Sequence, residues 1–384
     1  MNILLLGYGK TNKFLKRHFK NDNVVVITDD DYQKLLNSNI VFDFAFCSPG
    51  VRPDSLIYRL GNICSITYTN ELSYAINLLP QKTKIIAVTG SNGKTTTVSE
   101  IAYFLRKNNR STVLCGNVGN PLINLIDAKK QVDFVVIEIS SFQAELINIK
   151  RKFDCLIYTS LTENHSDKYL SYDEYKLAKK RLSYFANNVL VTPDVNRQLK
   201  IENANIIKEA DKELIEKYGL HNAINFALTQ KCLNLFSFNM NKEQLYNFVF
   251  PKYRQEIIFK NEDLIIINDS KSTTGESTNA CLKRFSDYFE IAILGGKIKS
   301  NFKIVKNIKA IFIAYGKDSG NFSKLCQIDY CFKSLKEAID KSFELLKYIK
   351  GKKALLFSPG GSSLEFKNYV ERGRYFELMV KNHE

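Results

Sequence analysis

Short apolar runs alternate with longer polar and amphipathic stretches along the whole chain, in three successive groups. Near-continuous apolar runs are typical of strands in a parallel sheet that helices cover on both faces. Between these runs, apolar residues recur with helical spacing, for example over residues 98–105. The pattern therefore predicts an α/β protein of three lobes with parallel sheets. The expected strands are Ile3–Leu6, Val24–Thr28, Phe42–Cys47, Ile85–Val88, Val132–Ile137, Phe153–Tyr158, Leu264–Ile267, Ile291–Leu294, Ala310–Ala314 and Ala354–Phe357.

Two breaks in this pattern divide the chain. Residues 80–83 form a polar stretch that begins with a proline, as expected of a linker, and the third alternating region begins near Pro251. We therefore expect domains at 1–80, 81–250 and 251–384. A chain of 384 residues is long enough for two or three domains.

Composition and charge narrow the class of protein. With 45% hydrophobic and 25% charged residues, the chain is expected to fold, and its apolar runs are too short to span a membrane or to form a signal peptide. Eight cysteines without a CxxC pair indicate reduced thiols in the cytoplasm. The net charge of +15 raises nucleic-acid binding as an alternative, but the lysines are spread along the chain. We expect no nucleic-acid partner and no membrane partner.

A glycine-rich segment, 90–97, follows the first expected strand of the middle lobe and leads into a helix. It reads GSNGKTTT, a spacing of GxxGKT that is shorter than the common GxxxxGK[ST]. Its glycines allow a tight turn whose N–H groups face a phosphate, and the helix N-terminus attracts anions. Lys94 is suited to the β- and γ-phosphates, and the hydroxyl of Thr95 is suited to Mg²⁺. The segment therefore predicts a site for ATP and Mg²⁺.

Three further residues of the middle lobe are candidates for metal binding. Glu138 ends a buried strand beside the phosphate loop, where a carboxylate suits Mg²⁺, although it could also cap the strand end. His165 follows the next strand, a position that favours a functional over a structural role. Lys179 lies on the apolar face of a helix expected over residues 171–182, so it is either buried or extends to solvent.

The first strand leads into Gly7-Tyr8-Gly9-Lys10-Thr11-Asn12, which is a partial dinucleotide fingerprint. Asn12 stands where the third glycine would be, while Asp29 and Asp30 lie where an acid for the ribose would fall. The segment indicates a Rossmann-like nucleotide lobe. The alternative is an ordinary turn between a strand and a helix.

The segment 90–97 resembles the ATP loop of the Mur ligase and folylpolyglutamate synthetase superfamily, whose loop has the same shortened spacing. The resemblance runs from residue 7 to residue 373, and further segments occur in the same order along the chain as in the family. The resemblance implies three lobes: a Rossmann-like lobe for the substrate, a central P-loop ATPase-like lobe and a Rossmann-like C-terminal lobe. The segments are GNVG at 116–119, HNAIN at 221–225, YRQE at 253–256, NDSKST at 268–273, LGGKIKS at 294–300 and SPGGSSLEFKNY–ERG at 358–373.

The last three segments favour the branch of this family that adds D-glutamate to UDP-N-acetylmuramoyl-L-alanine in peptidoglycan precursor synthesis. The resemblance implies an ATP-dependent ligase with an acyl-phosphate intermediate, ATP and Mg²⁺ as cofactors, and a cytoplasmic monomer. A sibling ligase of the Mur or folylpolyglutamate type is the alternative. Tyr253, Gly360 and Gly361 depart from the family pattern and suggest a second alternative, a nucleotide-binding protein without ligase activity.

The same resemblance implies a role for each candidate residue. In the family, the residue that corresponds to Lys179 carries a carbamate that bridges Mg²⁺. The resemblance assigns Lys299 to the side-chain carboxylate of the glutamate, and Lys297 is the alternative for this role. The implied catalytic residues are Lys94, Glu138, His165, Lys179 and Lys271, and the implied metal ligands are Thr95, Glu138, His165 and Lys179. The implied nucleotide contacts are Gly90, Ser91, Asn92, Gly93, Lys94, Thr95, Thr96, Asn222, Arg254, Asp269 and Lys271. The implied substrate contacts are Thr11, Asn117, Ser140, Thr273, Lys299, Ser363 and Tyr369.

Overall fold

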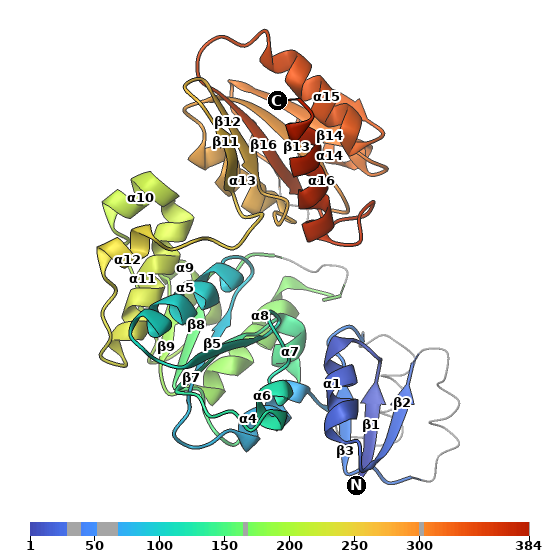
Figure 1. The fold of residues 1–384 in the computed structure, drawn as a ribbon, viewed down its shortest axis with the longest axis vertical. Helices are drawn as coiled ribbons and strands as arrows, with labels where there is room; N and C mark the ends of the chain where they lie inside the picture. Colours follow the sequence, from blue (N-terminus) through green and yellow to red (C-terminus); the bar gives the residue numbers. More distant parts are fainter. Residues whose placement is uncertain (29–39, 52–67, 164–167, 299–302, 384) are drawn as a thin grey trace. The chain divides into compact units, whose positions relative to one another are not determined.

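The computed structural model describes residues 1–28, 40–51, 68–163, 168–298 and 303–383 (Figure 1). These residues form three sheets. Helices alternate with the strands of each sheet along the chain, which confirms the expected three-lobed α/β fold. The chain divides into two compact units: 1–162 with 171–211 and 222–248, and 163–170 with 212–221 and 249–384. The finer division into domains near residues 80 and 250 stays a prediction. No described helix is long and apolar enough to cross a membrane.

The first sheet has the order β2-β1-β3-β4 in the described residues, and its strands are parallel. In the first turn of α1, the buried side chain of Asn12 donates to the carbonyl oxygens of Leu6 and Gly7, at 2.9 and 2.8 Å. Asn12 therefore closes this turn from within, where a dinucleotide fold needs a glycine. This geometry favours the ordinary strand-to-helix turn, and Asp29 and Asp30 lie outside the described residues. The elements are β1 (Asn2–Leu6), α1 (Lys10–His18), β2 (Asn23–Ile27), β3 (Phe44–Cys47), β4 (Tyr68–Thr69) and α4 (Glu71–Leu78).

The second sheet has the order β10-β9-β8-β5-β7-β6 and is parallel throughout. Its central strand, β5, is neighboured by β7 and β8, so the chain segments that follow these three strands meet at one edge of the sheet. The strands are β5 (Lys84–Thr89), β6 (Thr112–Gly116), β7 (Phe134–Glu138), β8 (Cys155–Tyr158), β9 (Val189–Val191) and β10 (Asn205–Ile206). The helices are α5 (Lys94–Lys107), α6 (Ile123–Asp127), α7 (Ser141–Glu145), α8 (Tyr172–Lys180), a 3₁₀ helix (Arg181–Phe185), α9 (Pro193–Leu199), α10 (Lys212–Tyr218), α11 (Leu220–Asn234) and α12 (Lys242–Tyr246).

The third sheet has the order β11-β12-β16-β13-β14-β15. Its strands are parallel as expected, except the edge strand β11, which was not among the expected strands and pairs antiparallel with β12. A connection as short as residues 261–263 permits only a hairpin, and the side chain of Asn261 accepts from the N–H groups of Asp263 and Leu264. The elements are β11 (Glu256–Lys260), β12 (Leu264–Asn268), α13 (Gly275–Arg284), β13 (Phe289–Gly295), β14 (Ala310–Tyr315), α14 (Ser319–Phe322), β15 (Tyr330–Phe332), α15 (Leu335–Leu346), β16 (Lys353–Gly360) and α16 (Tyr369–Lys381).

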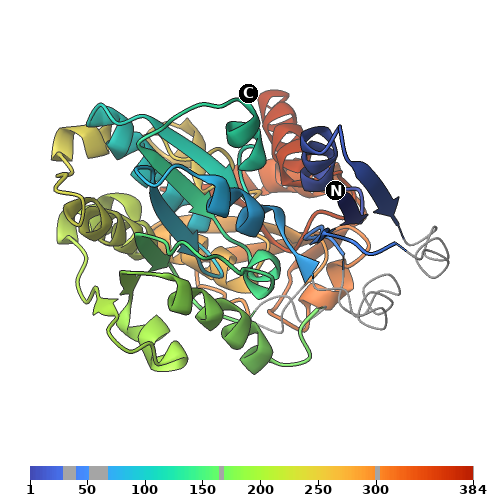
Figure 2. The same ribbon diagram turned by 90° about the horizontal axis from the view of Figure 1, so that it is seen from below.

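Alternate residues of the third sheet point to two separate apolar cores. On one face, Ile265 and Ile267 pack with residues of α13 and α14, and on the other face Ile266 packs with residues of α15 and α16. The C-terminal helices and strands of this lobe are coloured orange to red in Figures 1 and 2. Both faces of the strands are therefore covered, which explains why these segments read as near-continuous apolar runs. The ten expected strands all correspond to observed ones, and no end differs by more than three residues.

Candidate active site

The phosphate loop joins β5 to α5 and depends on its two glycines. Gly90 and Gly93 have φ angles of +152° and +84°. A Cβ on Gly90 would lie 2.1 Å from Oγ1 of Thr159, and one on Gly93 would lie 2.9 Å from Oδ1 of Asn225. Larger residues would therefore be excluded by both backbone conformation and space. Within the described residues, no side chain caps the N-terminus of α5, which leaves this helix end suited to an anion.

Lys94 and Ser91 fix the shape of the loop. The ammonium of Lys94 donates to the carbonyl oxygens of Gly90 and Ser91, at 2.7 and 3.0 Å. The hydroxyl of Ser91 lies 2.9 Å from that of Tyr175 and donates to the carbonyl oxygen of Thr162 at 2.8 Å. The ammonium of Lys94 thus contacts the loop that would hold the phosphates. The segment after β8 and the helix α8 stabilise this loop through their contacts with Ser91.

Glu138 links the phosphate loop to the segment that follows β6. Its carboxylate is buried, and Oε2 accepts from the hydroxyl of Thr95 while Oε1 accepts from the side-chain amide of Asn117, each at 2.7 Å. Parallel pairing of β5, β7 and β6 brings the three residues to one edge of the sheet. The structure therefore brings together residues for which the sequence predicted nucleotide, metal and sugar contacts.

Lys179 is buried, with 1% of its surface exposed, so the alternative of a lysine that extends to solvent is wrong. Its ammonium donates to Oγ1 of Thr89 and to the carbonyl oxygen of Gly90, at 3.2 and 3.0 Å. It also lies over the ring of Tyr175, 4.9 Å from the centroid. Burial holds the pKa of Lys179 well below its usual value, and the charge of Lys94 lowers this pKa further. An amine with a lowered pKa is more often neutral and therefore more nucleophilic.

The donor groups around Glu138 are suited to a hard divalent cation. The hydroxyl of Thr95 and the carboxylate of Glu138 are oxygen ligands already within 2.7 Å of each other. Mg²⁺ commonly takes only one or two protein carboxylates and keeps several waters. No group of three His, Cys, Asp or Glu residues that could hold a metal ion is present in the described part of the chain. His165 lies outside the described residues.

Asn225 is a site residue that the sequence reasoning named only as part of a segment. It lies on the first half of α11, is wholly buried, and its amide faces Gly93. Neither its amide nitrogen nor its amide oxygen has a hydrogen-bond partner within the described chain. An unpartnered amide beside a phosphate loop is available to a bound nucleotide. Asn222, an implied nucleotide contact, lies in the first turn of the same helix, which begins at Leu220.

Three other predicted contacts, in the first and middle lobes, lie at the start of a helix. Ser140 caps α7, where its hydroxyl accepts from the N–H of Gln143 at 3.2 Å and the Gln143 side chain accepts from the N–H of Ser140 at 2.9 Å. Thr96 is buried in the first turn of α5, next to Thr95. Thr11 lies in the first turn of α1 and is partly exposed.

In the third lobe, Asp269 follows β12 and is buried. Its Oδ2 accepts from the hydroxyl of Ser358 at 2.8 Å, and its Oδ1 accepts from the N–H of Gln255 at 3.0 Å. Burial raises the pKa of Asp269 to about 7, although the nearby Arg254 favours the ionised form. Asp269 and Arg254, both predicted to contact the nucleotide, thus lie within electrostatic range of each other.

Lys271 and Tyr369 also lie together in the third lobe. The ammonium of Lys271 is 4.2 Å from the centroid of the Tyr369 ring. The N–H of Lys271 donates to the carbonyl oxygen of Tyr253 at 3.0 Å. The ring of Tyr253 packs so tightly on Gly373 that a Cβ there would lie 2.4 Å from it. Tyr253, which departs from the family pattern, is therefore accommodated by the glycine of the ERG segment.

Gly361, one of the two glycines that depart from the family pattern, lies where a side chain would not fit. A Cβ on Gly361 would lie 2.6 Å from the backbone of Gly296, because the loops after β13 and β16 touch. Lys297 and Ser362 exchange two backbone hydrogen bonds of 2.8 Å across this contact. The hydroxyls of Ser362 and Ser363 are buried beside it and have no hydrogen-bond partner within the described chain. Thr273 is partly exposed, and Lys299 lies outside the described residues.

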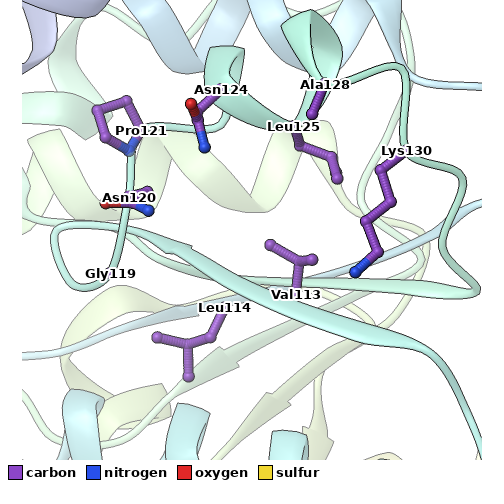
Figure 3. Close-up of a pocket in the computed structure, with 9 residues that line it drawn as sticks. All are labelled: Val113, Leu114, Gly119, Asn120, Pro121, Asn124, Leu125, Ala128 and Lys130. Atoms are coloured by element: carbon purple, nitrogen blue, oxygen red, sulfur yellow. The ribbon is translucent and has the colours of Figure 1, made fainter.

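A separate pocket of about 460 Å³ lies between β6 and α6 (Figure 3). It adjoins the segment after β6, but none of the predicted site residues lines it. Its position against an edge strand separates it from the phosphate loop, which follows the central strand. The lining residues are Val113, Leu114, Gly119, Asn120, Pro121, Asn124, Leu125, Ala128 and Lys130.

Comparison with known proteins gives one match to a family model. Residues 88–249 match the model of the Mur ligase middle domain. This segment contains the phosphate loop, Glu138, Lys179 and Asn225. The UDP-N-acetylmuramoylalanine–D-glutamate ligase of Francisella philomiragia is 29% identical over 409 residues, which cover 98% of this chain and 96% of that protein.

Solved structures of similar fold are also found. The MurF ligase of Thermotoga maritima, in complex with ADP, superposes with a TM-score of 0.64 at 14% identity, and the match covers 100% of this chain and 95% of that one. The bifunctional folylpolyglutamate synthase/dihydrofolate synthase of Yersinia pestis, complexed with AMPPNP and a Mn ion, gives a TM-score of 0.56 at 13% identity, covering 82% and 92%. These likenesses support the three-lobed α/β fold.

Proposed function

We propose that this chain is an ATP-dependent ligase of the Mur family that adds D-glutamate to UDP-N-acetylmuramoyl-L-alanine during peptidoglycan precursor synthesis. The observation that carries the proposal is the carboxylate of Glu138, which accepts from Thr95 of the phosphate loop and from Asn117 of the GNVG segment. One carboxylate thus joins the nucleotide side of the site to the segment assigned to the sugar substrate. The match to the Mur ligase middle domain over residues 88–249 supports the family.

The choice of D-glutamate rests on relatives that match along almost the whole chain. The Francisella ligase named above covers 98% of this chain, including the third lobe in which the amino acid would bind. The segments NDSK, LGGK and SPGGSS lie in that lobe, where they span the carboxyl ends of β12, β13 and β16 respectively. We therefore assign Ser363 and Tyr369 to the amino acid, and Lys299 with them as a prediction.

The proposed reaction has two steps. The L-alanyl carboxylate attacks the γ-phosphorus of ATP, and the bond between this phosphorus and the oxygen of the β-phosphate breaks. The products of this step are ADP and an acyl phosphate. The amine of D-glutamate then attacks the acyl carbon, the C–O bond to phosphate breaks, and the new amide nitrogen loses a proton. ATP is required because a carboxylate is a poor electrophile at neutral pH.

The chain's own residues would lower the repulsion between these anions. Lys94 would leave the carbonyl groups of its loop and pair with the β- and γ-phosphates, and we assign Lys271 and Arg254 to the nucleotide as well. Thr95 and Glu138 would hold Mg²⁺, which supplies positive charge beside the phosphates when it is bound. The unpartnered amide of Asn225 would contact the nucleotide beside Gly93.

Lys179 is the residue for which we propose a covalent modification. Its neutral amine would add to CO₂ and lose one proton, giving a carbamate. This change converts a buried cation into an oxygen ligand close to the phosphate loop, since the amine already contacts Gly90. The lowered pKa of Lys179 supports this proposal because only the neutral amine reacts with CO₂.

Phosphate release tests the function. The purified chain is incubated with ATP, Mg²⁺ and UDP-N-acetylmuramoyl-L-alanine, and single amino acids are added in parallel reactions. We expect release that requires both the nucleotide sugar and D-glutamate, while L-glutamate, L-alanine and L-lysine give background rates. Release that requires a different amino acid would retain the chemistry but replace the substrate. Release with no dependence on any amino acid would contradict the proposal.

A further inference from the structure

Arg372 is a wholly buried arginine in the first turn of α16. Its Nε and Nη2 donate to the hydroxyl and the carbonyl oxygen of Ser270, at 3.2 and 2.7 Å. Its Nη1 donates to the carbonyl oxygen of Gly361 at 3.0 Å. All three acceptors are neutral groups in loops, rather than groups of the helix that carries the arginine.

The guanidinium of Arg372 contacts three loops, two through hydrogen bonds and one through close packing. Ser270 belongs to the loop after β12, and Gly361 belongs to the loop after β16. The loop after β13 is reached as well, since a Cβ on Gly296 would lie 2.9 Å from Nη1 of Arg372. In an open α/β sheet, ligands bind just beyond the carboxyl ends of the strands. Arg372 therefore supports, from within, the edge of the third sheet where a ligand is expected.

The charge of Arg372 has no close counter-ion in the part of the chain that the structure describes. Among the described residues, no carboxylate lies within ion-pair distance of its guanidinium. The carboxyl groups that influence it, Asp269 and Glu365, act at longer range, and burial raises the pKa of each. A buried charge with only neutral acceptors is costly to keep, so its presence calls for a role beyond filling space.

The same loops carry groups that are available to a ligand. The hydroxyl of Ser270, besides accepting from Arg372, donates to the carbonyl oxygen of Tyr369 at 2.8 Å. Tyr369 in turn lies under the ammonium of Lys271. Ser362 and Ser363 follow Gly361 directly, and their buried hydroxyls have no partner within the described chain.

We propose that Arg372 is a positioning residue that clamps the loops after β12, β13 and β16, so that Lys271, Ser363 and Tyr369 are held ready for an anionic amino-acid substrate. This inference rests on the proposed function for the identity of the ligand, but the clamp itself does not. The planar fork of arginine donates to the loops after β12 and β16 in fixed directions and lies close to the loop after β13. A lysine keeps the charge and loses the fork.

The test compares Arg372→Lys with Arg374→Lys. Arg374 lies two residues further along α16 and is exposed, so it is a matched control for the chemical change. For each variant, hydrogen exchange of the segments 270–272, 295–297 and 360–363 is measured without ligand, and KM and kcat are measured for D-glutamate. We expect faster exchange at all three segments and a KM raised at least ~10-fold in Arg372→Lys, because hydrogen bonds to charged groups are lost. Arg374→Lys is expected to match the wild type.

A merely structural role for Arg372 would lower the folded fraction and the apparent kcat but leave KM unchanged, and this result would overturn the inference. Unchanged exchange at the three segments would overturn it too. If Arg372→Lys does not fold, Ser270→Ala removes one acceptor and keeps the charge. It is expected to raise both the exchange of segment 360–363 and KM, and no change in either would contradict the clamp. A wild-type chain that is inactive with every amino acid would refute the proposed function, while the exchange measurements would still test the clamp.

Discussion

The hydroxyl of Thr95 donates to the carboxylate of Glu138 at 2.7 Å, which ties the first turn of α5 to the end of β7. Because Asn117 donates to the other oxygen, the carboxylate is held in one orientation. Such an orientation suits a group that must meet a metal ion beside a phosphate. The relationship makes Glu138 the residue on which the nucleotide, metal and sugar assignments converge.

Replacement of Glu138 by glutamine tests this convergence. The amide keeps the shape and one acceptor, but it loses the negative charge that a divalent cation needs. We expect kcat to fall by ~10²–10³, the usual cost of removing one charge-stabilising group. Steady-state phosphate release measures the effect, and Glu202→Gln, at an exposed glutamate of the same unit, is the control. A Glu138→Gln variant with near wild-type turnover would remove Glu138 from the site.

The carbamate proposal for Lys179 predicts a requirement for dissolved CO₂. Wild-type activity is expected to fall when CO₂ is removed and to return when bicarbonate is added. In ¹³C-bicarbonate, nuclear magnetic resonance is expected to show a carbamate carbon that is absent from Lys179→Ala. The neighbouring Lys180→Ala serves as the control, since Lys180 is less buried. If Lys179→Ala keeps wild-type rates, or if its spectrum equals that of the wild type, the modification is wrong.

Asn225 is expected to contribute to nucleotide affinity. Its buried amide faces Gly93 and has no protein partner in the described residues, so its replacement by alanine costs no hydrogen bond in the free protein. We expect the Kd for ATP to rise about 10-fold in Asn225→Ala, which corresponds to one polar contact. Isothermal titration calorimetry measures this change. Asn234→Ala, at the exposed end of the same helix, should bind ATP as the wild type does.

Glu100 predicts a pH dependence of stability. It lies on α5, where its carboxylate accepts from the hydroxyl of Thr229 on α11 at 2.9 Å, and burial raises its pKa from 4.5 to about 8. Between these two pH values, the unfolded chain has lost the proton and the folded chain retains it. The free energy of unfolding therefore falls as pH rises from 4.5 to about 8, and it levels off above this range. At ~1.4 kcal/mol for each unit of pKa shift, the total fall is up to a few kcal/mol.

Glu100→Gln keeps the shape of the protonated acid and removes this titration. Urea unfolding of the variant should show a weaker fall in stability between pH 5 and 8. The exposed Glu202→Gln variant should keep the wild-type profile. Parallel profiles for all three proteins would mean that Glu100 is already ionised in the folded chain.

The sequence predicted those features that depend on neighbouring positions. The run of residues 84–97 determines the strand, loop and helix around Lys94, and helical spacing places Lys179 with Tyr175 on the buried face of α8. The position of Glu138 at the end of a buried strand was likewise evident. Each of these inferences needs only the period of a strand or helix and the rule for the carboxyl ends of parallel strands.

Features that depend on packing between distant segments were not predictable. The approach of Asn225 to Gly93 requires α11 to lie against the phosphate loop. The contacts of Arg372 require three loops to meet, and a buried arginine looks like a surface residue in a helical sequence. Asn12 illustrates the converse, because its side chain closes a turn that the sequence pattern left open to a nucleotide.

The most direct test of the ligase account follows the oxygen atoms of the substrate. UDP-N-acetylmuramoyl-L-alanine labelled with oxygen-18 in the L-alanyl carboxylate is incubated with the chain, ATP, Mg²⁺ and D-glutamate, and the released phosphate is analysed by mass spectrometry. If the carboxylate attacks the γ-phosphorus, each phosphate released will carry one labelled oxygen. Unlabelled phosphate would show that water, rather than the substrate carboxylate, attacks ATP, and this result would contradict the acyl-phosphate mechanism.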